Sequence, residues 1–319
     1  MNVDAHFHAF PESVIALLAS EPAYGIAASK DGVSGGRLTN HELFASLYDP
    51  AATLVELDRR GVDGAILSIA PRLFAYHVDP ALGERMADAT NAGLAQMCAH
   101  EPARLHWMAH VPLAAPARAA AVLEEAKLAG AVGVEIGTSV AGTPLDEASL
   151  EPFWAAAARL DMPIFVHPAY NADIPALKRY YLGNAVGNPL QTTIAAERLI
   201  CSGILDRHPQ LRLLLSHAGG FFPFLAGRLK HARTVRPELA DSPQDPWSYA
   251  GQLLFDTIIH DVQALTYLVS RVGAENVLLG SDTPYDMSTV RPLDQLRAAV
   301  DADTADLIAA RNPARIYGL

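Results

Sequence analysis

Eight short apolar runs recur along the chain, and segments with a helical pattern separate them. Most of these runs are continuously apolar, which is typical of parallel strands that are covered on both faces. Eight strands with helical crossovers in 319 residues favour a (β/α)8 TIM barrel over a doubly wound sheet, and no glycine-rich phosphate-binding fingerprint follows the first run. The predicted strands span residues 3–8, 64–70, 105–113, 132–138, 163–168, 211–219, 253–258 and 276–282.

Several of the intervening helices have readable ends. Asp49 and Asp79 each precede a proline, which places a capping carboxylate before the residue type that is favoured at the first helical position. Asp261 offers a similar cap to the segment 262–272. Glycine readily adopts the left-handed conformation that follows a helix, so helix ends are expected at glycines. The predicted ends lie at Gly61, Gly130 and Gly273.

Two connections are too long to be simple loops. Residues 9–48 follow the first predicted strand, and residues 169–210 follow the fifth and include a helical pattern. Both insertions come after the carboxyl end of a strand, where barrel enzymes build their sites, so we expect them to form lids or substrate walls. Because α/β barrels of this length fold as one unit, we expect residues 1–319 to form a single domain.

Charge and cysteine content narrow the setting. A net charge of −11 argues against a nucleic acid or an anionic membrane surface as the partner. No run approaches the 18 or so apolar residues of a spanning helix, and the N-terminus shows no signal-peptide pattern. Cys98 and Cys201 form no CxxC pair, which suits a reducing compartment. We therefore expect a cytoplasmic protein that acts on a small molecule.

The opening stretch MNVDAHFHAF places His6 and His8 two residues apart in the first predicted strand. Side chains at this spacing point to the same face of a strand, so both imidazoles can converge on one ion. With 12 histidines in the chain, however, chance alone gives roughly 0.4 such pairs. The motif becomes informative only if other strands supply partners.

Three further polar residues lie at the carboxyl ends of predicted strands, which ring one mouth of a barrel: His167, His217 and Asp282. Burying this many ionisable groups without a metal or mutual hydrogen bonds is costly. We predict that His6, His8, His167 and Asp282 bind one divalent metal ion, for which zinc is the first choice and manganese, iron and cobalt remain open. We assign His217 as a general acid/base, because imidazole titrates near neutral pH.

These motifs resemble a known family. DAHFH, FVHPA, SHAGG and GSDTP are similar to the metal-dependent barrels related to the amidohydrolases, and HAGGFFPFLAGRLKHARTVRPEL is similar to the branch that contains 2-amino-3-carboxymuconate-6-semialdehyde decarboxylase. The resemblance covers nearly the whole chain. It implies a decarboxylase in which His217, together with a metal-bound hydroxide, protonates the carbon that bears the carboxylate before CO₂ departs. Asp282 then belongs to the catalytic residues as well as to the metal ligands.

The resemblance also implies how the substrate is held. In this branch two arginines after the SHAGG motif bind substrate carboxylates, in part across a dimer interface, and Arg228 and Arg236 match them. Arginine suits this role because its planar fork pairs with a carboxylate in a bidentate manner. A homodimer and a small carboxylate substrate are therefore expected. A third arginine of the branch is missing, and His41 lies near its position, with Arg37 the nearest arginine.

Other residues near strand ends are weaker candidates. His110 on the third predicted strand is expected to line the pocket, and Tyr170, just beyond the fifth, is expected to contact substrate. Glu135 on the fourth strand could bridge a second metal ion, as carboxylates do in two-metal sites. That hypothesis is less favoured, since no lysine there offers a bridging carbamate.

Two other functions use the same residues. A hydrolase or hydratase would use the metal-bound hydroxide on a small carboxylate-bearing lactone, amide or alkene, and residue spacing alone does not distinguish this chemistry from decarboxylation. A binding protein with a structural metal would instead have a closed site that is fully ligated by protein. The expected open position beside His217 favours an enzyme.

Overall fold

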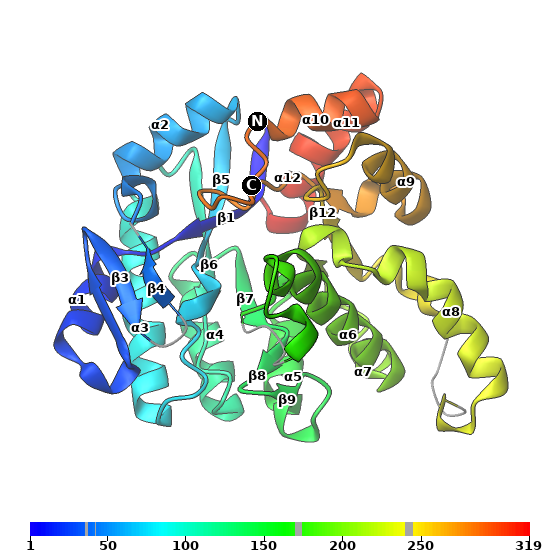
Figure 1. Cartoon of the computed structure of the whole chain (residues 1–319), viewed down its shortest axis with the longest axis horizontal. Helices are drawn as coiled ribbons and strands as arrows, with labels where there is room; N and C mark the ends of the chain where they lie inside the picture. The colour runs from blue at the N-terminus through cyan, green and yellow to red at the C-terminus, as the bar shows by residue number, and fades with distance from the viewer. Residues whose placement is uncertain (36–37, 42, 170–173, 240–244) are drawn as a thin grey trace.

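The chain folds as a barrel of eight parallel strands, as predicted (Figure 1). The computed structural model describes residues 1–35, 38–41, 43–169, 174–239 and 245–319, with the backbone alone for 38–41. Neighbouring strands of the barrel pair in the order of the chain. The strands are β1 (Val3–Ala9), β5 (Gly64–Ile69), β6 (Leu105–His110), β7 (Gly133–Gly137), β10 (Ile164–His167), β11 (Leu213–Leu215), β12 (Leu253–Asp256) and β13 (Val277–Leu278).

Backbone hydrogen bonds join the first strand to the segment that follows the last one. The Asp282 N–H donates to the His6 carbonyl at 2.9 Å, and the His8 N–H donates to the Thr283 carbonyl at 2.9 Å. Nearer the amino end of β1, the Ala5 N–H donates to the Leu279 carbonyl at 2.8 Å. These bonds bring both ends of the barrel sheet together, and they place the two histidines of β1 beside Asp282.

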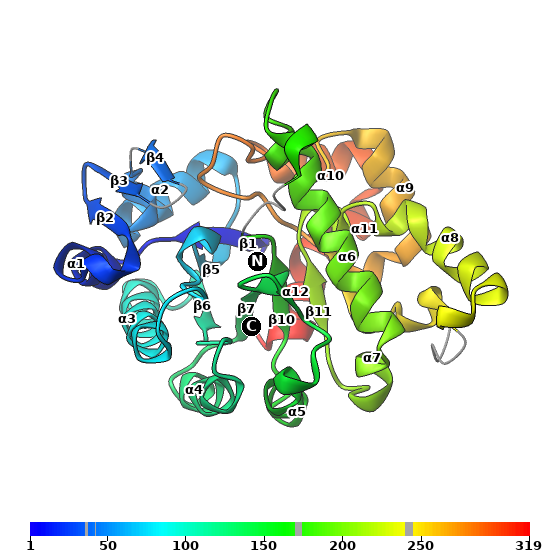
Figure 2. The ribbon, with the colours of Figure 1, turned by 60° about the horizontal axis from the view of Figure 1, so that its bottom comes forward.

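Helices surround the strands, and Figure 2 shows α3, α4, α5 and α6 outside the barrel. The predicted caps are confirmed: side chains of Asp49, Asp79 and Asp261 accept first-turn N–H groups at 2.9, 2.9 and 2.7 Å. Gly61, Gly130 and Gly273 follow three helices with positive φ, also as predicted. The helices are α1 (Glu12–Ser20), α2 (Pro50–Arg60), α3 (Pro80–Cys98), α4 (Pro116–Leu128), α5 (Glu151–Arg159), α6 (Asn188–Cys201), α7 (Ile204–Arg207), α8 (Phe222–Val235), α9 (Val262–Val272), α10 (Pro292–Ala299), α11 (Ala302–Asp306) and α12 (Asn312–Tyr317).

Both long insertions contain regular secondary structure among their described residues. The first contains α1 and a small antiparallel sheet of β2 (Ile26–Ser29), β3 (Gly32–Gly35) and β4 (Leu38–His41), which the sequence did not predict because these strands are short and mixed in polarity. The second contains α6 and α7, where a helical segment was expected. An unpredicted hairpin of β8 (Ser139–Val140) and β9 (Thr143–Pro144) follows β7.

Apolar side chains fill the barrel interior on the side of the amino ends of the strands. They come from seven of the eight strands and include Phe165 of β10, while alternate residues such as Val134 and Ile164 pack outward against the helices. These apolar residues form the floor of the site, and the polar residues of the site lie above them at the carboxyl ends of the strands. Within the described ranges, no helix has the length and apolar character that crossing a membrane requires. The floor residues are Val3, Ala5, Ile66, Met108, Phe165, Leu214, Leu254 and Leu278.

Candidate metal centre

Four buried side chains meet at the carboxyl end of the barrel, and they are the four predicted ligands. One ligand atom from each of His6, His8, His167 and Asp282 lies within 4.8 Å of the others. The Nε2 atoms of His6 and His8 are 3.1 Å apart, and the Asp282 Oδ1 lies 3.4 and 3.2 Å from them. Three imidazole nitrogens and one carboxylate oxygen form a donor set that suits zinc or a similar divalent ion.

The hydrogen bonds of the imidazoles fit this use. His6 donates its Nδ1–H to Asp256 at 2.7 Å, and His167 faces the Pro168 carbonyl through its Nδ1 at 2.9 Å. These partners leave the Nε2 atoms of His6 and His167 directed at the cluster, and the buried Nε2 of His167 has no hydrogen-bond partner among the described residues. An orphaned acceptor among converging nitrogens is the arrangement that a cation satisfies.

The ionisable groups of the cluster shift one another's pKa values. Burial opposes the charged form of His6, but its hydrogen bonds to Asp256 and Asp282 outweigh that effect and raise its pKa to about 10. Burial lowers the pKa of His8 and that of His167, and neighbouring histidines lower both further. Burial also opposes ionised Asp282, yet hydrogen bonds from His217, His6 and His8 hold its pKa well below the usual range. These shifts favour a charged imidazole at His6 and neutral imidazoles at His8 and His167.

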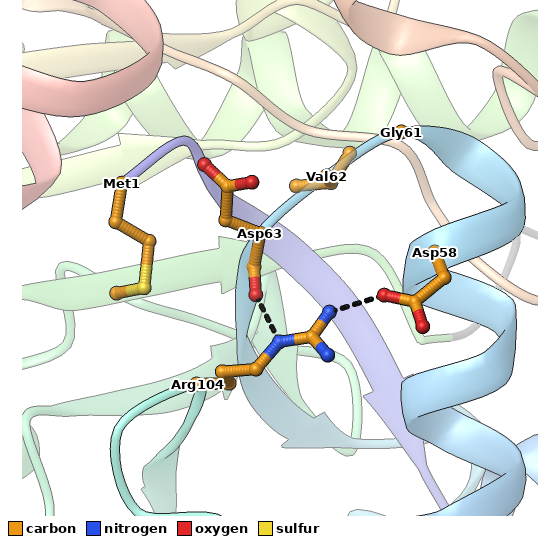
Figure 3. Close-up of a pocket in the computed structure, with 6 residues that line it drawn as sticks. All are labelled: Met1, Asp58, Gly61, Val62, Asp63 and Arg104. Carbon is orange, nitrogen blue, oxygen red and sulfur yellow. Dashed lines mark hydrogen bonds and ion pairs between the residues drawn. The ribbon is translucent and has the colours of Figure 1, made fainter.

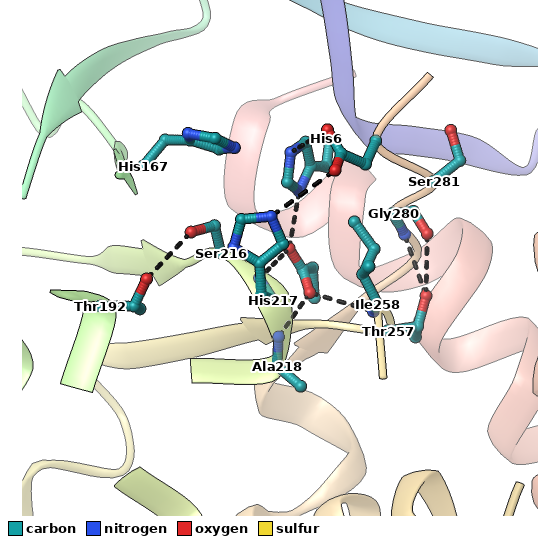
Figure 4. A network of polar contacts seen from close by, with 12 residues as sticks. His6, His167, Thr192, Ser216, His217, Ala218, Thr257, Ile258, Gly280 and Ser281 are labelled. Atoms are coloured by element: carbon teal, nitrogen blue, oxygen red, sulfur yellow. Dashed lines mark hydrogen bonds and ion pairs between the residues drawn. The ribbon is translucent and has the colours of Figure 1, made fainter. Parts of the chain in front are cut away.

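Asp256 organises the centre, and sequence reasoning missed it. Its Oδ2 accepts from His6 Nδ1 at 2.7 Å and from the His217 N–H at 2.9 Å. Figure 4 shows His6 and His217 side by side in this network of polar contacts. Its Oδ1 accepts from the N–H groups of Ala218 and Ile258 at 2.7 and 3.0 Å. The available signal was a lone carboxylate at the end of the apolar run LLFD, the same kind of position that singled out Asp282.

His217 lies in a turn rather than in a strand. β11 ends at Leu215, so the longer strand predicted here is wrong: the φ angles of His217 and Ala218 are +54° and +56°. At Gly220 a Cβ would lie 2.1 Å from a carbonyl oxygen of α6, so only glycine fits. The turn brings the His217 Nε2 to 3.6 Å from Asp282 Oδ2. A proton-carrying side chain thus lies beside the predicted ligands.

The two predicted substrate arginines lie outside this cluster in a single chain. Arg228 is exposed on α8, and Arg236 follows that helix, where it pairs with Glu238. Helix α8 extends away from the barrel (Figure 1). Next to Arg228 on this helix, the exposed Phe224 stacks on Tyr267 of α9 at 4.7 Å between ring centroids.

The remaining predicted substrate contacts are only partly described. His41 is the last residue of β4, where the structure describes the backbone alone, and Tyr170 and Arg37 lie outside the described residues. His110 is fully buried at the end of β6, and its ring stacks on Phe74 with centroids 5.7 Å apart. Burial lowers its pKa to about 4, so His110 is neutral near pH 7.

A hollow of about 500 Å³ lies at the opposite end of the barrel (Figure 3). Its residues precede β1, β5 and β6, so it opens at the amino ends of the strands. The Arg104 guanidinium there already donates to Asp58 Oδ1 at 2.6 Å and to the Asp63 carbonyl at 2.5 Å. This hollow contains none of the predicted site residues. It is lined by Met1, Asp58, Gly61, Val62, Asp63 and Arg104.

Comparison with known proteins places this barrel in a family. The amidohydrolase family model matches residues 3–319, and the chain belongs to that family. It is 32% identical over 254 residues to 2-amino-3-carboxymuconate-6-semialdehyde decarboxylase from Dictyostelium discoideum, covering 79% of this chain and 71% of the relative. It is 31% identical over 270 residues to gamma-resorcylate decarboxylase from Rhodococcus jostii, covering 77% of this chain and 80% of the relative.

A solved structure shares the fold over the full length. The 5-carboxyvanillate decarboxylase from Novosphingobium aromaticivorans, solved with manganese and a nitrobenzoic acid, superposes with a TM-score of 0.82 at 22% identity. The match covers 100% of this chain and 96% of that one. The predicted resemblance to the amidohydrolase-related decarboxylases is therefore confirmed by sequence, and the barrel is confirmed by structure.

Proposed function

We propose that this protein is a metal-dependent, non-oxidative decarboxylase of a small unsaturated or aromatic carboxylic acid. The observation that carries the proposal is the joint position of His217 and the four predicted ligands at one end of the barrel. The decarboxylase relatives support it, since two of them exceed 30% identity over more than two thirds of their length.

The proposed cofactor is one divalent ion held by His6, His8, His167 and Asp282. Zinc suits this mixture of nitrogen and oxygen ligands, manganese is supported by the manganese-bound relative, and iron or cobalt fits the same donors. When bound, the ion supplies positive charge that polarises an oxygen ligand and lowers the pKa of water.

Side chains of this protein would transfer the proton and orient the group that transfers it. His217 delivers a proton from its imidazole to the carbon that bears the carboxylate, making that carbon tetrahedral. The C–C bond then breaks, its electron pair restores the conjugated system, and CO₂ leaves. Asp256 holds the backbone of His217, and Asp282 lies within reach of its Nε2, so the imidazole is oriented for repeated proton transfer from water.

We propose that the substrate carboxylates are bound by Arg228 and Arg236 across a homodimer, with His41, His110 and Tyr170 lining the pocket. Exposure of both arginines on one chain supports this arrangement, because exposed cations on a projecting helix are available to a second subunit. The apolar Phe224–Tyr267 stack beside Arg228 adds surface that a partner subunit would cover.

We further propose that residues 1–319 act as one domain in the cytoplasm. The family model matches all but the first two residues, which supports one domain. Both cysteines are free, which suits a reducing compartment. Small carboxylic acids are the proposed partners, and neither nucleic acid nor membrane is expected.

The test follows CO₂ release by the metal-loaded protein. We would incubate zinc- and manganese-loaded protein with 2,6-dihydroxybenzoate, 5-carboxyvanillate and 2-hydroxybenzoate in ¹⁸O-labelled water. The proposal expects one CO₂ per product and no ¹⁸O in the product. Incorporation of ¹⁸O without CO₂ from a lactone or amide panel would establish the hydrolase alternative instead.

A further inference from the structure

Glu135 is a carboxyl group that the proposed reaction does not use. It is fully buried in the middle of β7, whose neighbouring residues Val134 and Ile136 pack outward, so the side chain of Glu135 faces the barrel interior. Neither of its carboxyl oxygens has a hydrogen-bond partner within the part of the chain that the structure describes. By contrast, buried Asp256 accepts four hydrogen bonds. An unsatisfied buried carboxyl is destabilising, so its presence calls for a reason.

The groups that act on Glu135 belong to the metal centre. Burial raises the pKa of Glu135 well above its usual value, while His6 and the Ser68 hydroxyl lower it and Asp282 raises it again. Glu135 therefore lies within electrostatic reach of two predicted ligands. A divalent cation held by those ligands would attract the Glu135 carboxylate strongly, because a low-dielectric interior screens charge weakly.

Ser68 contacts His8, a third predicted ligand. Ser68 is buried on β5, and its Oγ lies 3.4 Å from His8 Nδ1. The same hydroxyl lies close enough to Glu135 to affect its pKa, although the two groups do not reach full hydrogen-bond geometry. The Ser68 oxygen can accept from His8 Nδ1–H, and its O–H has two candidate acceptors, the Phe7 carbonyl at 3.5 Å and the Glu135 carboxylate.

The other two histidine ligands show why such support matters. His6 has a carboxylate at its Nδ1 at 2.7 Å, and His167 has the Pro168 carbonyl at 2.9 Å. Metal-binding histidines commonly donate their outer N–H to such acceptors, which fixes the tautomer and strengthens the ligand. Among the described residues, the Nδ1 of His8 has only the longer contact to the neutral Ser68 hydroxyl, at 3.4 Å, so an acceptor for that hydroxyl completes the pattern.

We propose that Glu135 is a positioning residue of the metal centre, which supports His8 through Ser68 and balances the charge of the bound cation. The inference rests on the proposed metal site and not on the reaction, so it holds or fails independently of CO₂ release. It also differs from a bridging role for Glu135, which would require a second ion.

The test measures metal affinity. Apo protein would be titrated with Zn²⁺ against a competing chelator, and ions per chain would be counted by elemental analysis. Glu135→Gln keeps the shape of the side chain but removes its charge, and we expect it to weaken Zn²⁺ binding about 10- to 100-fold. We expect Ser68→Ala to weaken binding in the same direction. Because both act along one path, Glu135→Gln should cost less affinity in the Ser68→Ala background than in the wild type.

Two matched variants control for loss of charge and of a buried hydroxyl. Glu197→Gln removes a carboxylate from α6, outside the barrel, and Thr90→Val removes a buried hydroxyl from α3. Both should bind Zn²⁺ within about twofold of wild type, and apo melting temperatures would report folding. If Glu135→Gln does not fold, Ser68→Ala against Thr90→Val carries the test. Wild-type affinity in Glu135→Gln, fully additive effects, or two ions per chain would overturn the proposal.

Discussion

The Asp256 carboxylate accepts a hydrogen bond from the Nδ1 of His6 at 2.7 Å, and the same oxygen accepts one from the backbone of His217 at 2.9 Å. One side chain at the end of β12 thus holds both a predicted metal ligand and the candidate acid/base. The proposed metal site and the proposed proton-transfer group thus share a single supporting residue, and changes at Asp256 should affect both.

Replacing Asp256 with asparagine tests this coupling. The amide keeps the size of the side chain but has one acceptor oxygen instead of two, so either His6 and His217 or Ala218 and Ile258 lose their acceptor. It should therefore lower metal affinity about 10- to 100-fold. Turnover should also fall when the metal is saturating, since the His217 turn loses a backbone partner. Chelator competition and steady-state kinetics at high metal would check both effects. Full activity at saturating metal would show that Asp256 serves the ion alone.

Removing the imidazole of His217 separates chemistry from metal binding. We expect His217→Ala to retain one ion per chain, because His217 is not among the four ligands, while CO₂ release falls about 10²- to 10⁴-fold through loss of proton transfer. Elemental analysis and single-turnover CO₂ measurements would be run in parallel. Undiminished turnover by this variant would rule out the assigned role.

Metal binding should release a proton from His6. In the apo protein its pKa is raised from 6.5 to about 10, so the ring is protonated at pH 7 and must lose that proton to bind an ion. Apparent affinity should therefore rise with pH, by up to about tenfold per unit, and level off near pH 10. Isothermal titration in buffers of different ionisation enthalpy would count the protons. No proton release at pH 7 would contradict this expectation.

The same shift affects the stability of the apo protein. A pKa raised by folding stabilises the folded state fully below the unfolded value of 6.5, and the benefit is lost as pH rises through about 10. The apo protein should therefore become less resistant to urea across this window. His6→Asn, which cannot hold the proton, should show a flatter pH profile in the same unfolding experiment.

The arginines of the α8 region test the proposed dimer. Arg228→Ala and Arg236→Ala should each raise KM about tenfold or more, as expected for loss of a charge-assisted hydrogen bond to a carboxylate. Arg159→Ala, which removes an exposed arginine paired with Glu124 on the outer helices, is the matched control and should leave KM unchanged. Light scattering would give the mass in solution. A fully active monomer would exclude a shared site.

Local sequence patterns predicted most of the secondary structure of the barrel. Continuous apolar runs marked all eight barrel strands, and Asp49, Asp79 and Asp261 marked the helix starts, because both signals depend on neighbours in sequence. The convergence of His6, His8, His167 and Asp282 was also predicted, since the strand ends of a barrel meet at one mouth. The resemblance to a decarboxylase branch added the reaction, which spacing alone left open.

Other features depend on contacts that no local pattern encodes. Asp256 acts through partners on β1 and after β11, so its role becomes visible only when the barrel brings these distant segments together. The left-handed turn at His217 looked like a continued strand because the apolar run of LLLSHAGG extends to Leu215, two residues before the histidine. The sheet of β2, β3 and β4 lacked a signal for the same reason: its short strands are stabilised by pairing, not by periodicity.

The hydrogen bonds that join β1 to residues 279–283 have a consequence for biosynthesis. His6 and His8 are synthesised long before Asp282, the residue whose carboxylate completes the cluster. Until Asp282 has been added, the two histidines would form an incomplete chelate with weak affinity for an ion. Under the proposed ligand set, tight metal binding would therefore begin only after the sheet has closed on itself, and a firmly held ion would mark a fully folded barrel.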